Sequence, residues 1–282
     1  MNIIVIDMEN AGSVFEDSEK TFIELSNSQR LQIINALINS SMNLTLIAKH
    51  LGITMQEAHR NFNRLMDAGI VSKDSSGSYS LTTFGNTIVT QIPSINFLSK
   101  NKNYFSDHYF ADLPMKFVQR IGSLDNSRFI QGLVAVIEEI KDMYRYSEEY
   151  IYGMIPQVPL DLMEVAAKTV KERKIRFNYI LPKNAVIPRK GKDFLNEINY
   201  QELLKNGLVE RKMIEDVRVS VVMNEKKALV MFPSIKGETD MNGAFSNSIH
   251  KENNKLFHEW CLDYFRYCWL SSKPFDNTKL RE

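Results

Sequence analysis

Over the first third of the chain, apolar residues recur at helical spacing and are interrupted by short turns. Residues 28–42 place apolar side chains three and four positions apart, with Ser28 as the expected N-cap. A short apolar helix follows and ends at Gly52. The next helix begins at once, because Thr54 and Glu57 have the spacing of a capping box. This pattern predicts two helices joined by a tight turn.

Strand patterns follow this second helix. Its inward stripe consists of Ala58, Phe62 and Leu65. Gly69 stops it, and the short runs 70–74 and 78–82 then flank a Ser-Ser-Gly tip, which predicts a hairpin. The helical pattern returns over 83–100. The order of these elements is typical of a winged helix–turn–helix, in which the second helix lies in the major groove of DNA and the hairpin flanks it.

The segment 101–157 is less regular. After a break at Pro114, residues 127–146 form an amphipathic pattern with a single apolar face. The residues of this face are Ile130, Leu133, Val134, Ile137 and Ile140. We therefore expect one long helix over 127–146 that serves as core or as a dimer interface.

Residues 158–282 alternate between helical and strand patterns. The expected elements are a helix at 160–174, a strand at 175–182, a helix at 192–207, a hairpin at 217–233 and a helix at 255–272. Repetition of helix and strand predicts a sheet covered by helices. The expected fold class is α+β, with a winged helix–turn–helix followed by an α/β effector or sensor domain. The expected domains are a lead segment 1–27, a DNA-binding domain 28–100, a helical linker or dimerisation region 101–157, and the effector domain 158–282.

The composition, with 44% hydrophobic and 24% charged residues, is that of a globular protein. The longest apolar runs are far shorter than the roughly 20 residues that a membrane helix needs. Residues 1–9 lack the basic start of a signal peptide, so a cytoplasmic protein without a membrane partner is expected. Residues 28–100 carry six Lys or Arg against three Asp or Glu. This positive balance is compatible with nucleic acid but too small to establish it.

Motifs for catalysis and metal binding are absent from the sequence. Cys261 and Cys268 are seven residues apart on an expected helix, about 10 Å of rise, which is too far for a disulfide within that helix. We interpret both as buried structural cysteines. No zinc-ligand spacing, phosphate-binding loop or dinucleotide motif occurs. The sequence therefore predicts no cofactor, no metal and no enzymatic activity.

The stretch "AKHLGITMQEAHRNFNRLMDAGIVSKDSSGSYSLTTFG" resembles winged-helix regulators of the ArsR and MarR kind. The positions that match the family pattern are Ala48, Leu51, Gly52, Leu65, Gly69, Ile70 and Val71. Ala58 departs from it, because the family usually has a larger apolar residue there. The resemblance implies binding to double-stranded DNA.

A second resemblance covers nearly the whole chain after residue 20. The phrases "YFSDHYFADLPMKFVQRIGSL", "SEEYIYGMIPQ", "ALVMFPSIKGETD" and "FHEWCLDYFRYCW" are similar to archaeal regulators of the methanogen filament-formation regulator type. The C-terminal part also looks like the phospholipase D-type sensor domain of TrmB-like archaeal sugar regulators. Phospholipase D chemistry needs a His followed two residues later by Lys, whereas His250 is followed at once by Lys251 and then by Glu252.

The residues expected to contact DNA lie on the second helix of the motif and on the hairpin. They are Thr54, Gln56, Glu57, His59, Arg60, Asn63, Arg64, Lys73 and Tyr79. Gln56 and Asn63 suit adenine edges, and Arg60 suits guanine or phosphate. Lys73 and Tyr79 are expected to hold the DNA backbone. The alternative interpretation is that this charged helix face is merely solvated.

An effector contact is expected in the C-terminal half. The candidates are His108, Lys236, Trp260 and Tyr264. A structural histidine and a core aromatic stripe are the competing interpretations. The functional prediction is a dimeric, sequence-specific transcriptional regulator modulated by a small-molecule effector. The alternatives are a divergent phosphodiesterase-like enzyme with an accessory winged helix, and a winged helix that binds protein in a transcription complex.

Overall fold

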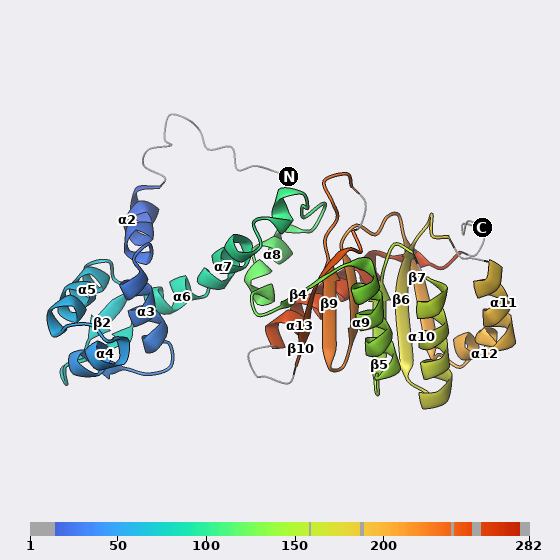
Figure 1. The fold of residues 1–282 in the computed structure, drawn as a ribbon, viewed down its shortest axis with the longest axis horizontal. Helices are drawn as coiled ribbons and strands as arrows, with labels where there is room; N and C mark the ends of the chain where they lie inside the picture. Colours follow the sequence, from blue (N-terminus) through green and yellow to red (C-terminus); the bar gives the residue numbers. More distant parts are fainter. Residues whose placement is uncertain (1–14, 158, 187–188, 238–239, 250–254, 277–282) are drawn as a thin grey trace. The chain divides into compact units, whose positions relative to one another are not determined.

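The computed structural model describes residues 15–276 except 158, 187–188, 238–239 and 250–254 (Figure 1). The chain divides into two compact units, Met1–Pro93 and Ser94–Glu282. Both combine helices and strands, so the expected α+β class is confirmed. Among the described residues, every helix is too short or too polar to span a bilayer.

The first unit has the element order of a winged helix–turn–helix. Its elements are α2 (Glu16–Leu25), α3 (Ser28–Leu37), β1 (Met42–Asn43), α4 (Leu44–Leu51), α5 (Met55–Asp67), β2 (Val71–Lys73), β3 (Ser78–Leu81) and α6 (Thr83–Val89). The strands pair antiparallel in the order β1-β3-β2. The predicted tight turn is present, because Gly52 closes α4 in the left-handed conformation with φ 65°. The predicted hairpin turns between Asp74 and Ser78.

The expected lead segment 1–27 contains the helix α2, whose residue Glu24 is buried. The part of this segment before residue 15 lies outside the described residues. The N-cap of α3 is Asn27 rather than the expected Ser28, since the Asn27 side chain accepts a hydrogen bond from the Arg30 amide at 3.0 Å. Asn caps a helix as effectively as Ser does, and a cap one residue earlier leaves Ser28 inside the first turn.

The second unit is built on one mixed sheet. Its strands are β4 (Arg128–Gln131), β5 (Tyr150–Met154), β6 (Arg176–Pro182), β7 (Val209–Ile214), β8 (Ser220–Asn224), β9 (Lys227–Met231), β10 (Gly243–Ser248) and β11 (Lys273–Pro274). They lie in the order β11-β7-β6-β5-β8-β9-β10-β4. The pairs β5–β6 and β6–β7 are parallel and the other pairs are antiparallel.

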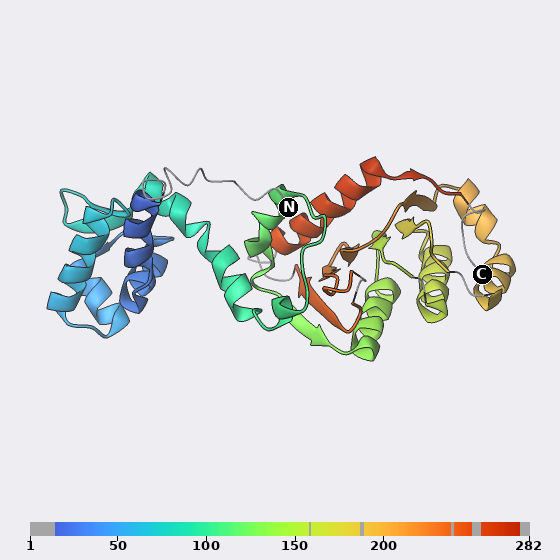
Figure 2. The ribbon, with the colours of Figure 1, turned by 90° about the horizontal axis from the view of Figure 1, so that it is seen from above.

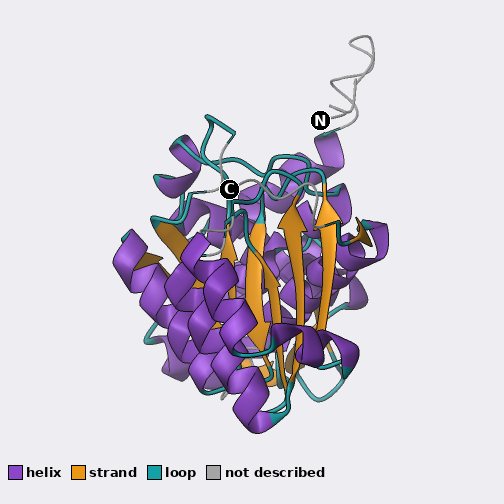
Figure 3. Cartoon of the chain, turned by 90° about the vertical axis from the view of Figure 1, so that its right-hand side faces the viewer, coloured by secondary structure: helices purple, strands orange, loops and turns teal. Residues whose placement is uncertain are grey.

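Helices cover both faces of this sheet. They are α7 (Ile92–Lys100), α8 (Met115–Val118), α9 (Leu133–Arg145), α10 (Leu160–Arg173), α11 (Arg189–Glu197), α12 (Tyr200–Lys205) and α13 (Lys255–Ser271), with short 3-10 turns η1 (Tyr104–Ser106) and η2 (Ile121–Leu124). Figure 2 shows α13 on one side of the sheet and α9 and α10 on the other, and the strands are orange in Figure 3. Alternate strand residues serve the two layers: Val221 packs toward α13, and Val222 toward α9 and α10.

The long helix expected over 127–146 does not form as such. Residues 128–131 are the strand β4, which pairs with β10. Gly132, with φ 100°, ends the strand, and α9 begins after it. The buried face of α9 includes Ile140 as expected but otherwise differs, because Leu133 is 45% and Val134 75% exposed while Val136, outside the expected face, is buried. A short apolar run fits the period of a helix as well as that of a strand. The pairing with β10 makes residues 128–131 a strand.

Two further expectations are corrected by the structure. Residues 101–157, expected as a helical linker or dimerisation region, belong to the second unit and supply the strands β4 and β5 of its sheet. The helix expected over 192–207 is divided into α11 and α12, because Asn199 adopts a left-handed conformation with φ 56° between them. The helices at 160–174 and 255–272, the strand at 175–182 and the hairpin at 217–233 are found as expected.

Candidate nucleic-acid interface

The start of α5 is fixed by a reciprocal capping box. The Thr54 hydroxyl accepts a hydrogen bond from the Glu57 amide at 3.1 Å, and Oε2 of Glu57 accepts one from the Thr54 amide at 2.9 Å. These hydrogen bonds from Thr54 lower the pKa of the Glu57 carboxyl group. Glu57, expected to contact DNA, is thus engaged in capping α5 through Oε2.

The outer face of α5 carries four exposed polar side chains. They are Gln56, His59, Arg60 and Asn63. Within the described residues no carboxylate pairs with Arg60, and Nδ2 of Asn63 lies 3.4 Å from Nδ1 of His59. The buried face of the same helix holds Ala58, Phe62 and Leu65 as expected. The helix therefore presents hydrogen-bond donors and acceptors to solvent between Gln56 and Asn63.

Arg64, expected to contact DNA, faces the body of the unit. Its Nε donates to Oε2 of Glu24 at 3.2 Å, and Nη2 donates to Oε1. The same buried carboxylate also receives Nε of Arg30 at 2.9 Å. The ion pair ties α5 to α2 and α3, and Asn61 adds a hydrogen bond of 2.9 Å to Gln29 on α3. The sequence analysis did not identify Glu24 as the partner of Arg64, because the two residues are forty positions apart in the chain.

The two hairpin residues expected to contact DNA, Lys73 and Tyr79, differ in exposure to solvent. Tyr79 is 2% exposed and its ring stacks on Phe62, with centroids 3.8 Å apart, so it belongs to the core and not to a DNA contact. The sequence carries a signal for this, since Ser78 and Ser80 flank Tyr79 and alternate positions of a strand face opposite sides. Lys73 remains exposed, with Nζ 5.4 Å from the Tyr79 ring.

The tip of the hairpin is an Asp-centred turn. Oδ1 of Asp74 accepts hydrogen bonds from the Ser76 hydroxyl at 2.7 Å and from the amides of Ser76 and Ser78, both at 2.9 Å. These bonds lower the pKa of Asp74. On α4, Lys49 and His50 are also exposed, and sequence reasoning did not select them. Arg60, Lys73 and Lys49 are thus exposed basic residues of α5, β2 and α4.

The four residues expected to contact an effector do not form one site. Nε1 of Trp260 donates to the Phe117 carbonyl at 3.1 Å, and the ring of Tyr264 contacts that of Phe117 at 5.2 Å between centroids. Both lie in the core under α13, because an aromatic stripe at helical spacing is the natural inner face of a helix. They are not the walls of a ligand site.

His108 and Lys236 lie on neighbouring segments, since the amide of Ile235 donates to the Asp107 carbonyl at 2.8 Å. His108 is 9% exposed, and its Nδ1 and Nε2 lie 2.7 Å from Asp107 and 3.2 Å from Asp240. These contacts fasten the segment that follows η1 to the loop after β9. Lys236 is exposed.

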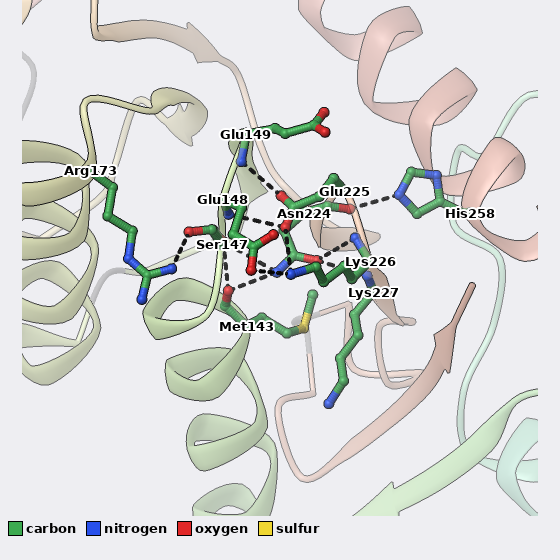
Figure 4. A network of polar contacts seen from close by, with 10 residues as sticks. All are labelled: Met143, Ser147, Glu148, Glu149, Arg173, Asn224, Glu225, Lys226, Lys227 and His258. Atoms are coloured by element: carbon green, nitrogen blue, oxygen red, sulfur yellow. Dashed lines mark hydrogen bonds and ion pairs between the residues drawn. The ribbon is translucent and has the colours of Figure 1, made fainter. Parts of the chain in front are cut away.

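A polar network surrounds the turn between β8 and β9 (Figure 4). Nδ2 of Asn224 donates to the Met143 carbonyl at 2.8 Å, and its Oδ1 accepts from the amides of Lys226 and Lys227. Nε2 of His258 lies 2.7 Å from the Asn224 carbonyl, and burial lowers the pKa of this imidazole. Most partners are backbone groups, so the network fixes a turn and offers no free nucleophile. The stretch from His250 to Glu252 lies outside the described residues.

No cluster of three or more metal-ligating side chains occurs in the part of the chain that the structure describes.

No family model and no curated protein match the sequence. Similar solved structures include TrmBL2, an archaeal chromatin protein, at 12% identity and a TM-score of 0.38, covering 88% of this chain and 94% of that one. They also include a homodimeric winged helix–turn–helix DNA-binding domain from Mycobacterium bovis, at 16% identity and a TM-score of 0.30, covering 38% of this chain and 99% of that one. Nuc, a phospholipase D family member from Salmonella typhimurium, is similar at 11% identity and a TM-score of 0.38, covering 54% of this chain and 100% of that one. These likenesses are too low to assign a function.

Proposed function

We propose that this protein is a dimeric, sequence-specific DNA-binding transcriptional regulator. The observation that carries the proposal is the outer face of α5, which exposes four polar side chains, whereas Met55 at the start of the helix is its exposed apolar residue. A tight turn precedes this helix and a hairpin follows it, as in proteins that insert such a helix into the major groove. An interface between proteins would favour apolar and aromatic side chains at this position.

The roles follow from side-chain chemistry. Gln56 and Asn63 can each form two hydrogen bonds to adenine, and Arg60 can do so to guanine. Lys73 on β2 supplies a charge for the phosphate backbone. Glu57, Arg64 and Tyr79 leave the set of proposed contacts, because they serve the cap, the ion pair with Glu24 and the core.

Arg60→Ala is expected to weaken binding to the preferred DNA sequence by about 1–3 kcal/mol, because a bidentate contact to guanine is lost. The preferred sequence is first selected from random oligonucleotides with the full-length protein. Affinity is then measured on this sequence and on random DNA at several salt concentrations. Arg145→Ala, at an exposed site on α9 of the second unit, is the matched control and should leave both affinities unchanged.

Equal losses on selected and random DNA would reduce Arg60 to a phosphate contact. An unchanged affinity would remove α5 from the interface. The wild-type protein should also show a steep fall of affinity with salt, since bound phosphates release counterions. A partner that binds with little salt dependence would instead support the protein-interaction alternative.

We propose that two chains associate through the exposed apolar face of α2. Phe22 is 59% exposed and Ile23 is 47% exposed on this helix, whereas Glu24 on its other side is buried. Two reading helices on a two-fold axis supply more contact than one. Sedimentation should give twice the 32.6 kDa chain mass. Phe22→Glu should yield monomers that remain folded, and a dimer that survives this change would place the interface elsewhere.

We propose that the second unit senses rather than catalyses. Its described histidines, His108 and His258, are held by carboxylates and by a backbone carbonyl. The phosphodiesterase-like alternative has a direct test. Hydrolysis of a chromogenic phosphodiester by the purified protein, abolished by His250→Ala, would overturn this proposal.

A further inference from the structure

A narrow cavity lies between the strands β5, β6 and β7 and the helices α10 to α12. Its volume is about 50 Å³. Its lining is mainly apolar and includes Gly153, Met163, Ala166, Tyr179, Tyr200 and Arg211. A single water needs roughly 10–15 Å³ by the same measure, so the cavity has room for a short ligand.

One row of residues across three strands creates this cavity. Gly153 on β5 lies beside Tyr179 on β6, and Tyr179 lies beside Arg211 on β7. Because Gly153 has no side chain, the sheet is hollow at the β5 end of the row. A Cβ atom there would come within 3.3 Å of the Tyr144 hydroxyl and would occupy part of the space. Alanines 166 and 167 on α10 leave similar room opposite.

At the other end of the row lies Arg211, whose guanidinium has no carboxylate partner among the described residues. The Arg211 guanidinium lies over the Phe275 ring at 4.0 Å and beside the Tyr200 ring at 6.0 Å. No carboxylate of a described residue pairs with Arg211, although exposed arginines elsewhere on this unit, such as Arg120 and Arg145, do have such partners. The Arg211 side chain also hydrogen-bonds to the Tyr179 hydroxyl. Stacking on a ring holds the guanidinium plane, so its remaining N–H groups can still donate to an anion.

A hydroxyl donor lies next to this guanidinium. The hydroxyl groups of Tyr179 and Tyr200 are 2.9 Å apart. One of them donates to the other, which leaves the second proton without an acceptor among the described residues. Burial raises the pKa of both phenols, so both keep their protons at neutral pH. The cavity thus offers an apolar body and, at one end, hydrogen-bond donors from Arg211 and the tyrosine pair.

We propose that this cavity binds a short-chain aliphatic carboxylate. The carboxylate would accept from Arg211 and from the free phenol proton, and the alkyl chain would lie against Met163, Ala166 and the space beside Gly153. A cation would be repelled by Arg211, and a purely apolar guest would leave the guanidinium unpaired.

The test uses the full-length protein with methyl-labelled methionine and alanine, so that Met163 and the alanines of α10 report on the cavity. Butyrate and isovalerate are titrated without DNA, with butyramide and isovaleramide as neutral molecules of equal shape. The acids should give saturable shifts of these methyl signals and bind at least tenfold more tightly than the amides. Equal binding of acid and amide, or no saturable shift with either acid, would overturn the proposal.

Two variants test whether the carboxylate of the ligand binds Arg211. Arg211→Gln should reduce the affinity for the acids to that of the amides while leaving amide binding unchanged, which also shows that the cavity is still folded. Arg176→Gln, at an exposed arginine on the neighbouring strand β6, should change nothing. An Arg211→Gln protein that still prefers the acids would refute the assignment. Because binding is measured without DNA, a protein that binds the acids but no DNA would disprove the proposed function and not this site.

Discussion

Phe62→Ala is expected to destabilise the first unit by about 3–5 kcal/mol, the usual cost of removing a fully buried aromatic ring. Phe62 is 0% exposed and stacks on Tyr79 at 3.8 Å, so the change removes the contact between α5 and the hairpin. A small unit has only about 5–15 kcal/mol of stability. DNA binding should therefore fall together with the folded fraction of this unit.

The unfolding of the two units can be followed separately by spectroscopy. Both tryptophans, Trp260 and Trp269, lie in the second unit, so fluorescence excited through them reports on that unit alone. Urea titrations of Phe62→Ala should shift the circular dichroism transition of the first unit and leave the tryptophan transition in place. Tyr79→Phe is the control, since it keeps the ring and should preserve both stability and DNA affinity. A loss of DNA affinity in a fully folded Tyr79→Phe protein would restore Tyr79 to the interface.

Glu24→Ala is expected to destabilise the same unit by about 2–3 kcal/mol. Removing one partner of a buried ion pair costs about 3–5 kcal/mol, because the remaining charge stays buried. Here Arg30 has a side chain only 11% exposed, whereas that of Arg64 is 51% exposed and can turn to water, which reduces the effect.

The same urea titration measures this change, with Glu19→Ala on the exposed side of α2 as the control. The control should stay within about 0.5 kcal/mol of the wild type, as for most surface substitutions. Equal stability of Glu24→Ala and Glu19→Ala would show that the ion pair adds nothing. Arg64 would then be free for the DNA contact that the sequence suggests.

The parts of the fold that the sequence predicts correctly depend on local signals. The capping box of Thr54 and Glu57, the left-handed Gly52 and the tip after Asp74 each involve residues within a few positions of one another. Such contacts form in the same way whatever surrounds them. The helix–turn–helix and its hairpin could therefore be predicted from the sequence.

The remaining features depend on partners far away in the sequence. β4 is a strand because it pairs with β10, more than a hundred residues later, and its apolar pattern alone fits a helix as well. Arg64 pairs with Glu24, and nothing near either residue in the sequence indicates that contact. The cavity beside Gly153 requires three strands in register, which no spacing of residues reveals.

The division of the chain between Pro93 and Ser94 has a consequence for how such proteins diversify. The backbone passes from one unit to the other once, so each unit is encoded by one uninterrupted stretch of the gene. A single recombination event near the codon for Pro93 would join the eight-stranded sheet of the second unit to a different N-terminal unit. Proteins assembled in this way can exchange one unit in evolution while the other stays unchanged.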